Sequence, residues 1–496
     1  MLRRLSRNTL RFQMQILAAL LLFALSPLPC EPATPDAWRS RSIYQVLTDR
    51  FAAVPTPQQC ANYGDYCGGT FAGISAHLDY IQGMGFDAVW ISPIVDNAPG
   101  GYHGYWQRDM LSINSHFGGA ADLLALSNEL HARGMFLMVD IVANHASSDG
   151  DVSANRPFSS AGDYHDCSGC PAGCDVDDYQ NLVQMEHCRL AGLMDFNQSD
   201  ANGSNAELLY SWIAGLVANY SVDGLRIDTL PYVHPTFWQR FVAAAGGIYA
   251  VGEVDNGDVD FVSPWQAPSG ANAAVPGLLS YPLFYTLRGA FAQKQPMEQI
   301  GQAVTAARAK YADTSLLGVF TDNHDNPRFM HETTDQGTYR AAIAYSILSD
   351  GIPIVYYGSE WFYSGGNDPG CREPLWCPGI SYNASAAGLG PTLAALNAHR
   401  RANSLWKDQQ AERFSDDRFY AFSKGTSTLA AFTNVGTGGA AQTRTLKAPL
   451  PWPAGTRLCS LFACEAGCAT VAADGTLAVT VEGAHGVTVL SPSVSC

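Results

Sequence analysis

Carboxylates, histidines and an arginine stand at the ends of four apolar segments, and their types suit chemistry on a sugar. The segments are FLMVDIVANH (136–145), GLRIDT (224–229), AVGEVD (250–255) and VFTDNHD (319–325). If each apolar stretch is a buried strand of one parallel barrel, the polar residues that follow meet at one end of it. Asp228, Glu253 and Asp325 then share a pocket, although they are distant in sequence. Three carboxylates suit a reaction that develops positive charge, as glycoside cleavage does.

The three carboxylates can divide the work of a retaining glycosidase. Such an enzyme needs a carboxylate nucleophile and a carboxylic acid roughly 5–5.5 Å apart. Arg226 lies two residues before Asp228 on the same face of a strand, where a guanidinium would hold that carboxylate charged and oriented. Glu253 ends the next apolar segment, and this context suits an acid that has to keep its proton. Asp325 could then stabilise the positive charge.

Two histidines belong to the same pattern. His145 and His324 end the first and the fourth segment, where they could donate hydrogen bonds to sugar hydroxyls. Taken alone, an aspartate at a strand end is more often a helix cap or an ion-pair partner, and a lone histidine is usually structural. The joint pattern favours the functional interpretation.

The elements that must position these residues alternate along most of the chain. Apolar segments typical of strands lie at 42–47, 86–91, 135–142, 222–227, 248–254, 316–320 and 352–357. Amphipathic segments typical of helices lie between them, for example at 120–133, 205–219 and 301–311. This alternation predicts a parallel sheet with crossover helices, and eight such units predict a barrel. Residues 277–285 are the candidate for the remaining, poorly marked strand.

Two regions depart from the alternation. Residues 146–199 are rich in Gly, Ser, Asp and Cys and have no long periodic run, which indicates an insertion held by disulfides. After about residue 407, short strand-like segments at 419–422, 429–433, 443–446 and 486–490 predict a small antiparallel domain. We therefore expect a signal peptide (1–30), a barrel (31–143 and 200–407), an inserted domain (144–199) and a C-terminal β-sandwich (408–496).

The N-terminus and the cysteines predict export. Four arginines at positions 3–11 precede the apolar segment 16–25, which is typical of a cleaved signal and short for an uncleaved anchor. Of the 13 cysteines, Cys30 lies where cleavage is expected, and the even set that remains indicates disulfides. Cys167-x-x-Cys170 could also bind a metal, although an oxidising compartment favours bridges. Asn197, Asn202, Asn219 and Asn383 begin sequons, so we expect a glycoprotein.

Composition excludes several classes of partner. The chain carries 29 basic and 45 acidic residues, a net charge of -16, and 47% of its residues are hydrophobic. A large core is therefore available, and an acidic surface disfavours nucleic acid and anionic membranes while leaving neutral polysaccharides unaffected. We expect a secreted, extracellular monomer without a nucleic-acid or membrane partner.

The four segments resemble, in order and spacing, the signature regions of the α-amylase family, glycoside hydrolase family 13. Secreted fungal-type members are the most similar, and the resemblance covers nearly the whole mature chain. Supporting stretches are SIYQVLTDRF (42–51), CGGTFAGI (67–74), YHGYWQRD (102–109), GIPIVYYG (351–358) and GGNDPGCRE (365–373). The resemblance implies a (β/α)8 TIM barrel with domain B inserted after strand 3 and a C-terminal antiparallel β domain. It also implies endo-hydrolysis of α-1,4-glucosidic bonds in starch, glycogen and maltooligosaccharides with retention.

Residue roles follow from the same resemblance. It implies that Asp228 is the nucleophile, Glu253 the general acid/base and Asp325 the transition-state stabiliser. It implies substrate contacts by His103, Tyr105, Trp106, His145, Arg226, His324, Asp368 and Arg372. It further implies a structural Ca²⁺ between barrel and insertion, held by Asn144, Glu186, Asp195 and the backbone carbonyl of Tyr232. Oxygen ligands of this kind suit a hard cation.

The chain departs from the family after GLRIDT. Pro231 and Tyr232 stand where fungal-type members usually have a Lys-His pair that contacts the acceptor sugar. Calcium could persist, because a backbone carbonyl needs no particular side chain, but the product pattern and the tendency to transfer become uncertain. Tyr232 could stack on a sugar ring or only fill the loop. Cys371 and Cys377 resemble an added bridge that pins the loop carrying Asp368 and Arg372.

Three alternatives to an ordinary α-amylase stay open. A 4-α-glucanotransferase would pass the same covalent intermediate to a sugar, and the altered acceptor side favours it. A maltooligosaccharide-forming relative is a second alternative. A non-catalytic glucan-binding protein is a third, although such a protein would be expected to lack one of the carboxylates.

Overall fold

The computed structural model describes residues 33–53, 60–148, 150–199, 203–268, 270, 272–376, 388–447, 449–463 and 467–494. The predicted signal peptide lies outside the described residues, as do Cys30, Cys377, Cys464, Cys496, Asn202 and Asn383. The predicted bridge between Cys371 and Cys377 therefore falls outside them too. Across the described ranges, no helix is both long and apolar enough to cross a bilayer.

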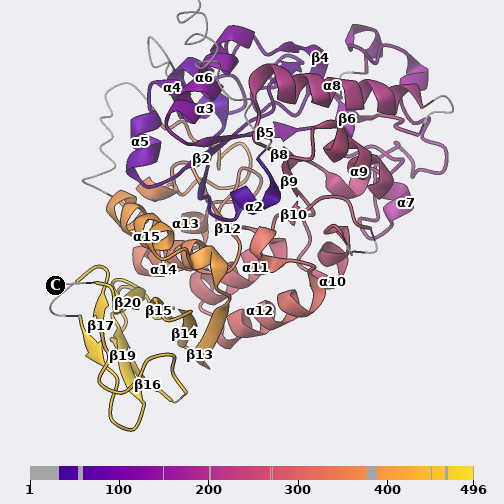
Figure 1. Ribbon diagram of the computed structural model, residues 1–496. Helices are drawn as coiled ribbons and strands as arrows, with labels where there is room; N and C mark the ends of the chain where they lie inside the picture. Colours follow the sequence, from indigo (N-terminus) through magenta and orange to yellow (C-terminus); the bar gives the residue numbers. More distant parts are fainter. Residues whose placement is uncertain are drawn as a thin grey trace, which may run out of the picture. The chain divides into compact units, whose positions relative to one another are not determined.

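Eight parallel strands form a closed barrel, which confirms the predicted fold (Figure 1). In chain order they are β1 (Ile43–Gln45), β2 (Ala88–Ile91), β5 (Phe136–Ile141), β8 (Gly224–Ile227), β9 (Tyr249–Gly252), β10 (Gly277–Leu278), β11 (Gly318–Val319) and β12 (Ile352–Tyr356). Each strand pairs with the next, β12 pairs with β1, and a parallel bridge from Leu279 to Gly318 closes the ring between β10 and β11. Because every pairing in the ring is parallel, all strands end on the same rim.

The strands are buried on both faces, as their near-continuous apolar sequences predict. All five residues of β12 and five of the six residues of β5 are buried. The register sets β5 beside β8 so that Asp140 pairs with Arg226. Charged residues on neighbouring strands therefore meet inside the barrel.

The sixth strand differs from the prediction for residues 277–285. Only Gly277–Leu278 is strand, and the helix α11 (Tyr281–Leu287) begins three residues later. Pro282 explains the early helix, because proline fits the first helical turn and cannot donate to a strand ladder. Gly277 is required by space, since a Cβ there would lie 2.4 Å from the Tyr249 hydroxyl.

Helices surround the barrel (Figure 1). They include α6 (Ala120–Ala132), α8 (Ser204–Tyr220), α9 (Pro235–Ala244), α12 (Glu298–Lys310), α14 (Gln336–Leu348) and α15 (Gly390–Ala402). The helix α14 is buried around almost its whole circumference, because it contacts β12 on one side and the C-terminal strands on the other. Its sequence, apolar on most faces, is that of a fully buried helix.

The insertion after β5 is a short excursion held by covalent links. It leaves and returns through β6 (His145–Ala146) and β7 (Met194–Asp195), which pair antiparallel. Between them lie the helix α7 (Leu182–Met185) and two disulfides, Cys167–Cys174 and Cys170–Cys188. The Cys167-x-x-Cys170 pair is therefore bridged in the structure, as the oxidising-compartment interpretation predicts.

The C-terminal strands form an antiparallel domain, as predicted. One sheet contains β13 (Gln410–Asp416), β14 (Phe419–Lys424), β15 (Thr428–Thr433), β20 (Val487–Ser491), β17 (Arg457–Ser460) and β18 (Ala469–Thr470). A second contains β16 (Gln442–Leu446) and β19 (Leu477–Val481). Further disulfides join Cys459 to Cys468 here and Cys60 to Cys67 near the barrel's start. The domain boundaries given above stay predictions.

Candidate active site

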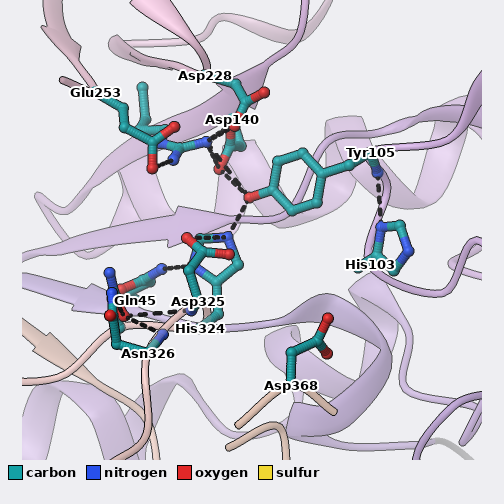
Figure 2. A network of polar contacts seen from close by, with 12 residues as sticks. Gln45, His103, Tyr105, Asp140, Asp228, Glu253, His324, Asp325, Asn326 and Asp368 are labelled. Atoms are coloured by element: carbon teal, nitrogen blue, oxygen red, sulfur yellow. Dashed lines mark hydrogen bonds and ion pairs between the residues drawn. The ribbon is translucent and has the colours of Figure 1, made fainter. Parts of the chain in front are cut away.

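One buried guanidinium organises the carboxyl end of the barrel (Figure 2). Arg226 on β8 binds Asp228 Oδ1 through Nη1 at 2.7 Å and Glu253 Oε1 through Nη2 at 2.7 Å. Its Nη1 also lies 2.9 Å from Oδ1 of Asp140, the neighbouring residue on β5. The side chain of Arg226 is 1% exposed, so these charge-assisted hydrogen bonds are shielded from water. The predicted contact between Arg226 and Asp228 is present.

Three carboxylates facing one cation change the proton affinity of the cluster. Burial raises the pKa of Asp228 well above its usual value, the Arg226 charge opposes that shift, and Glu253 and Asp140 reinforce it. Burial likewise raises the pKa of Asp140 to about 6, again against Arg226. The raised pKa of Asp228 differs from the expectation that Arg226 keeps this carboxylate charged, because burial outweighs the charge of the guanidinium.

Polar groups surround the carboxyl group of Glu253, contrary to the expectation drawn from its apolar sequence context. Its Oε2 accepts a hydrogen bond from the Thr229 backbone N–H at 3.2 Å, and its Oε1 accepts one from the Tyr281 hydroxyl at 3.2 Å. Thr229 reaches it through a left-handed backbone, with φ of 50°. The neighbours Gly252 and Val254 are buried, whereas Glu253 itself faces the open end of the barrel.

Asp325 is the most accessible of the three carboxylates. Its side chain is 35% exposed, and its oxygens lie 3.3 Å from Arg372 Nη2 and 3.4 Å from His324 Nε2. Arg372 also binds Asp368 at 2.9 Å, and Tyr102 donates from its hydroxyl toward Asp368. The guanidinium of Arg372 therefore holds the carboxylate of Asp325 in place while leaving it accessible to solvent.

Aromatic and imidazole rings form the wall beside the carboxylates. The Tyr105 hydroxyl donates to Asp140 Oδ2 at 2.8 Å, and its ring stacks on His324 at 5.3 Å and on His103 at 5.6 Å between centroids. Burial lowers the pKa of His324 well below its usual value and that of His145 to about 4, so both rings are neutral at physiological pH. A neutral imidazole can both donate and accept hydrogen bonds.

The predicted site residues share one cleft of about 560 Å³. Its lining includes the three carboxylates and also His103, Tyr105, Trp106, His145, Tyr232, Asp368 and Arg372. The two remaining predicted residues, Arg226 and His324, lie buried behind this lining, where they hold Asp228 and Asp325. A separate cavity, lined mainly by residues of α11 and α12, contains none of the predicted site residues.

Comparison with known proteins decides the family. Residues 45–168 and 185–422 match the family described as "Alpha amylase, catalytic domain". The "Alpha-amylase" of Saccharomycopsis fibuligera is 37% identical over 503 residues, which covers 95% of this chain and 97% of that protein. The chain belongs to the α-amylase family.

Two further similarities agree with this family. "Alpha-amylase 1" of Lipomyces kononenkoae is 45% identical over 364 residues, 69% of this chain and 56% of that relative. The solved structure of an α-amylase from Malbranchea cinnamomea superposes with a TM-score of 0.85 at 38% identity, covering 93% of this chain and 98% of that one. The α-amylase fold and a glycoside hydrolase activity of the α-amylase type, both expected from the sequence, are confirmed.

Sequence reasoning missed several residues of this α-amylase site. Asp140 is the clearest, because it accepts hydrogen bonds from Arg226, Tyr105 and Trp90 although it was given no role. Its signal was present in the first segment, since a carboxylate inside a buried apolar strand needs a partner. The sequence does not indicate the role of Tyr281, because it predicts a strand over residues 277–285.

Oxygen atoms converge where the family's calcium site is expected. The side-chain amide of Asn144 lies 3.2 Å from Asp195 Oδ1 and 3.0 Å from the Tyr232 carbonyl oxygen. If the amide oxygen of Asn144 points toward Asp195 and Tyr232, three oxygen atoms face one another, and a bound cation is needed to stabilise them. If the amide nitrogen points that way instead, Asn144 donates hydrogen bonds to both oxygens. Burial raises the pKa of Asp195 well above its usual value, a shift that a bound cation would oppose.

Glu186 follows the last residue of α7 in the insertion. It lines a cavity of about 300 Å³ together with His165, and His165 Nδ1 contacts Asp195 Oδ2 at 2.5 Å. Within the described part of the chain, no three His, Cys, Asp or Glu side chains are arranged to hold a metal by themselves. The donor set is therefore one of amide, carbonyl and carboxylate oxygens, which fits calcium in chemistry.

Tyr232 connects the barrel with the insertion. It ends the short turn η3 (Leu230–Tyr232) after β8 and packs against the apolar cluster of Val176, Met185 and Cys188. The same side chain lines the cleft. It therefore both fills space beneath the insertion and presents surface to the cleft.

Proposed function

We propose that this protein is an endo-acting α-amylase that hydrolyses internal α-1,4-glucosidic bonds of starch, glycogen and maltooligosaccharides with retention. The observation that carries the proposal is the binding of Asp228 and Glu253 to the two ends of one buried guanidinium. Sharing one cation keeps the carboxylates close, which favours the retaining spacing of roughly 5–5.5 Å over the roughly 6.5–9.5 Å of inverting enzymes.

Asp228 and Glu253 take part in both steps of the reaction. Asp228 attacks the anomeric carbon while Glu253 gives its proton to the oxygen of the departing sugar, and a covalent glycosyl-enzyme forms. Glu253 then takes a proton from water, which displaces Asp228 and releases the product. Asp325 faces the positive charge that develops in both transition states.

The surrounding residues bind the sugar that is cleaved. His103 and His145 line the cleft and offer hydrogen bonds to its hydroxyl groups, and Arg372 with Asp368 closes the same side. His324, whose ring nitrogens contact Gln45 and Tyr105 behind the lining, supports Tyr105 and Asp325. The ring of Tyr105 lies beside Asp140, and the ring of Trp106, 38% exposed, is available to a sugar face. Tyr232 presents a further aromatic surface at the acceptor side.

Calcium would be held by Asn144, Asp195 and the Tyr232 carbonyl, with Glu186 as the fourth proposed ligand. A bound cation supplies charge compensation for the buried Asp195 and links the barrel to the insertion. These residues support the structure and take no part in bond cleavage.

We further propose that the protein is exported and works as an extracellular monomer on soluble or granular α-glucan. The described disulfides support an oxidising compartment. The domain boundaries at 30, 143, 199 and 407 are part of the same proposal. Neither nucleic acid nor a membrane is a proposed partner, given the net charge of -16.

A 4-α-glucanotransferase is the second candidate, and the Pro231-Tyr232 pair at the acceptor side is the observation that favours it. An aromatic surface without a nearby cation could retain an acceptor sugar and exclude water. A maltooligosaccharide-forming relative would rest on the same observation. A non-catalytic glucan-binding protein is disfavoured, because all three carboxylates line the cleft.

Two variants test the proposed roles. Asp228→Asn and Glu253→Gln should each lower kcat on soluble starch by at least about 10³-fold, because each removes one half of the covalent chemistry. Both variants should keep a melting temperature close to that of the wild type. Activity like that of the wild type in either folded variant would contradict the assignment.

A further inference from the structure

The helix α11 presents two tyrosine hydroxyls to two carboxylates. Tyr281 donates to Glu253 Oε1 at 3.2 Å, and Tyr285 donates to Asp255 Oδ1 at 2.8 Å. Tyr281 and Tyr285 are four residues apart on a helix, which corresponds to a rise of roughly 6 Å. Glu253 and Asp255 are two residues apart, which corresponds to roughly 6.6 Å in an extended chain, so the two tyrosines are spaced like the two carboxylates. Each carboxylate after β9 therefore has its own tyrosine on one face of α11.

Asp255 keeps one oxygen available to the cleft. Its side chain is exposed and lines the same cleft as Asp228, Glu253 and Asp325. Tyr285 occupies Oδ1, and among the described residues Oδ2 has no hydrogen-bond or ion-pair partner. Burial raises the pKa of Asp255 to about 6, with the Tyr285 hydrogen bond opposing the shift, so the group is ionised at neutral pH.

Ring packing fixes the orientation of Tyr285. Its ring lies 5.1 Å from that of Phe284 and 6.2 Å from that of Tyr281 between centroids. The backbone of Gly257 approaches the ring so closely that a Cβ there would lie 3.3 Å from Cδ2. Asp255 is thus held by a side chain that packs against α11 and Gly257 on one side and is 42% exposed.

Asp255 follows Glu253 by two residues and lines the cleft together with Pro231 and Tyr232, the residues at the expected acceptor side. Figure 2 shows Glu253 and Asp228 near one end of the Tyr105 ring, whereas His103 lies near the other. In the proposed mechanism Glu253 gives its proton to the oxygen of the departing sugar, so that sugar binds next to Glu253 and within reach of Asp255.

We propose that Asp255, held by Tyr285, is a specificity-determining residue that accepts hydrogen bonds from hydroxyl groups of the sugar on the leaving-group side. The inference rests on the proposed hydrolysis of α-glucan. A carboxylate accepts hydrogen bonds only, and sugar hydroxyls are the neutral donors that fit it. The pair supplies a polar contact on the side where Pro231 and Tyr232 offer neither a cation nor an imidazole.

Two substrates separate this role from catalysis in general. Maltoheptaose labelled at its reducing end extends beyond Glu253, whereas α-maltotriosyl fluoride has no sugar as its leaving group. Asp255→Ala should lower kcat/KM on maltoheptaose about tenfold, mainly through KM, and shift the preferred cleavage position. Its effect on the fluoride should stay below about twofold.

Further variants sharpen the test. Tyr285→Phe should change the cleavage pattern in the same direction by about threefold in kcat/KM, and Asp255→Asn should restore part of the loss because its amide oxygen still accepts. Asp260→Asn is the matched control, because Asp260 pairs with Lys310 outside the cleft lining, and it should behave like the wild type.

An unchanged cleavage pattern and KM in Asp255→Ala would overturn the inference. Equal losses on both substrates would overturn it as well, since they would indicate general damage to the site. Failure of the proposed function would be visible separately, as a wild-type protein that hydrolyses neither substrate, and that outcome would remove the basis for both proposals.

Discussion

Arg226 determines the chemistry of the site at the scale of single residues. One cation faces Asp140, Asp228 and Glu253, so the cluster cannot carry three full negative charges without a large cost in a buried position. Asp140 is one of the charges that raise the pKa of Asp228, although no bond to the substrate is assigned to it.

A second residue-scale effect concerns a buried histidine far from the cleft. His399 on α15 contacts the Thr428 hydroxyl of β15 through Nε2 at 2.8 Å, and its Nδ1 contacts Asn403 Nδ2 at 3.1 Å. Burial lowers the pKa of His399 to about 4. The folded state therefore holds this ring neutral at a pH where the unfolded chain protonates it.

This depressed pKa predicts acid destabilisation. The contribution of His399 to the free energy of unfolding is complete above the unfolded pKa of 6.5 and is lost as pH falls toward about 4, a loss of about 3 kcal/mol. His399→Gln, which cannot take up a proton, should lose less stability than the wild type between pH 7 and pH 4 in urea titrations. The exposed His485→Gln is the control and should follow the wild type; identical pH dependence in His399→Gln would refute the role.

At the scale of elements, the barrel strands were predictable because most of them are continuous apolar runs followed by polar residues. The sixth strand was not, because Gly277–Leu278 is too short to show a pattern. Tyr281, Leu283 and Phe284 continue the apolar run, but Pro282 turns it into α11. The contact of Tyr281 with Glu253 depends on that helix and was therefore out of reach of the sequence.

Calcium is predicted to act on the insertion as an element. Asn144 precedes β6 and Asp195 ends β7, so a cation there would fasten both ends of the insertion to the barrel. Chelation should lower the melting temperature of the wild type by roughly 5 °C in scanning calorimetry. Asp195→Asn should melt lower and respond little to the chelator, while the exposed Asp166→Asn should respond like the wild type. A wild-type melting curve that ignores the chelator would count against the site.

At the scale of the whole molecule, the order of the barrel strands could be predicted from the sequence. The packing of the insertion and of the C-terminal sheet against the barrel could not. Successive strands joined by crossover helices fall side by side, so Asp228, Glu253 and Asp325 had to share one rim. The insertion has no such periodicity, and the position of Tyr232 between Met185 and the cleft depends on its disulfide-linked loops. The burial of α14 likewise needs both the barrel and the C-terminal sheet in place.

The reaction with maltoheptaose, followed by proton NMR of the anomeric protons, tests the central claim most directly. The account predicts that the first products are shorter than the substrate and carry the α configuration at the new reducing end, which mutarotation later converts to the equilibrium mixture. Products that begin as the β anomer, or that are longer than maltoheptaose, would contradict a retaining hydrolase built on Asp228 and Glu253.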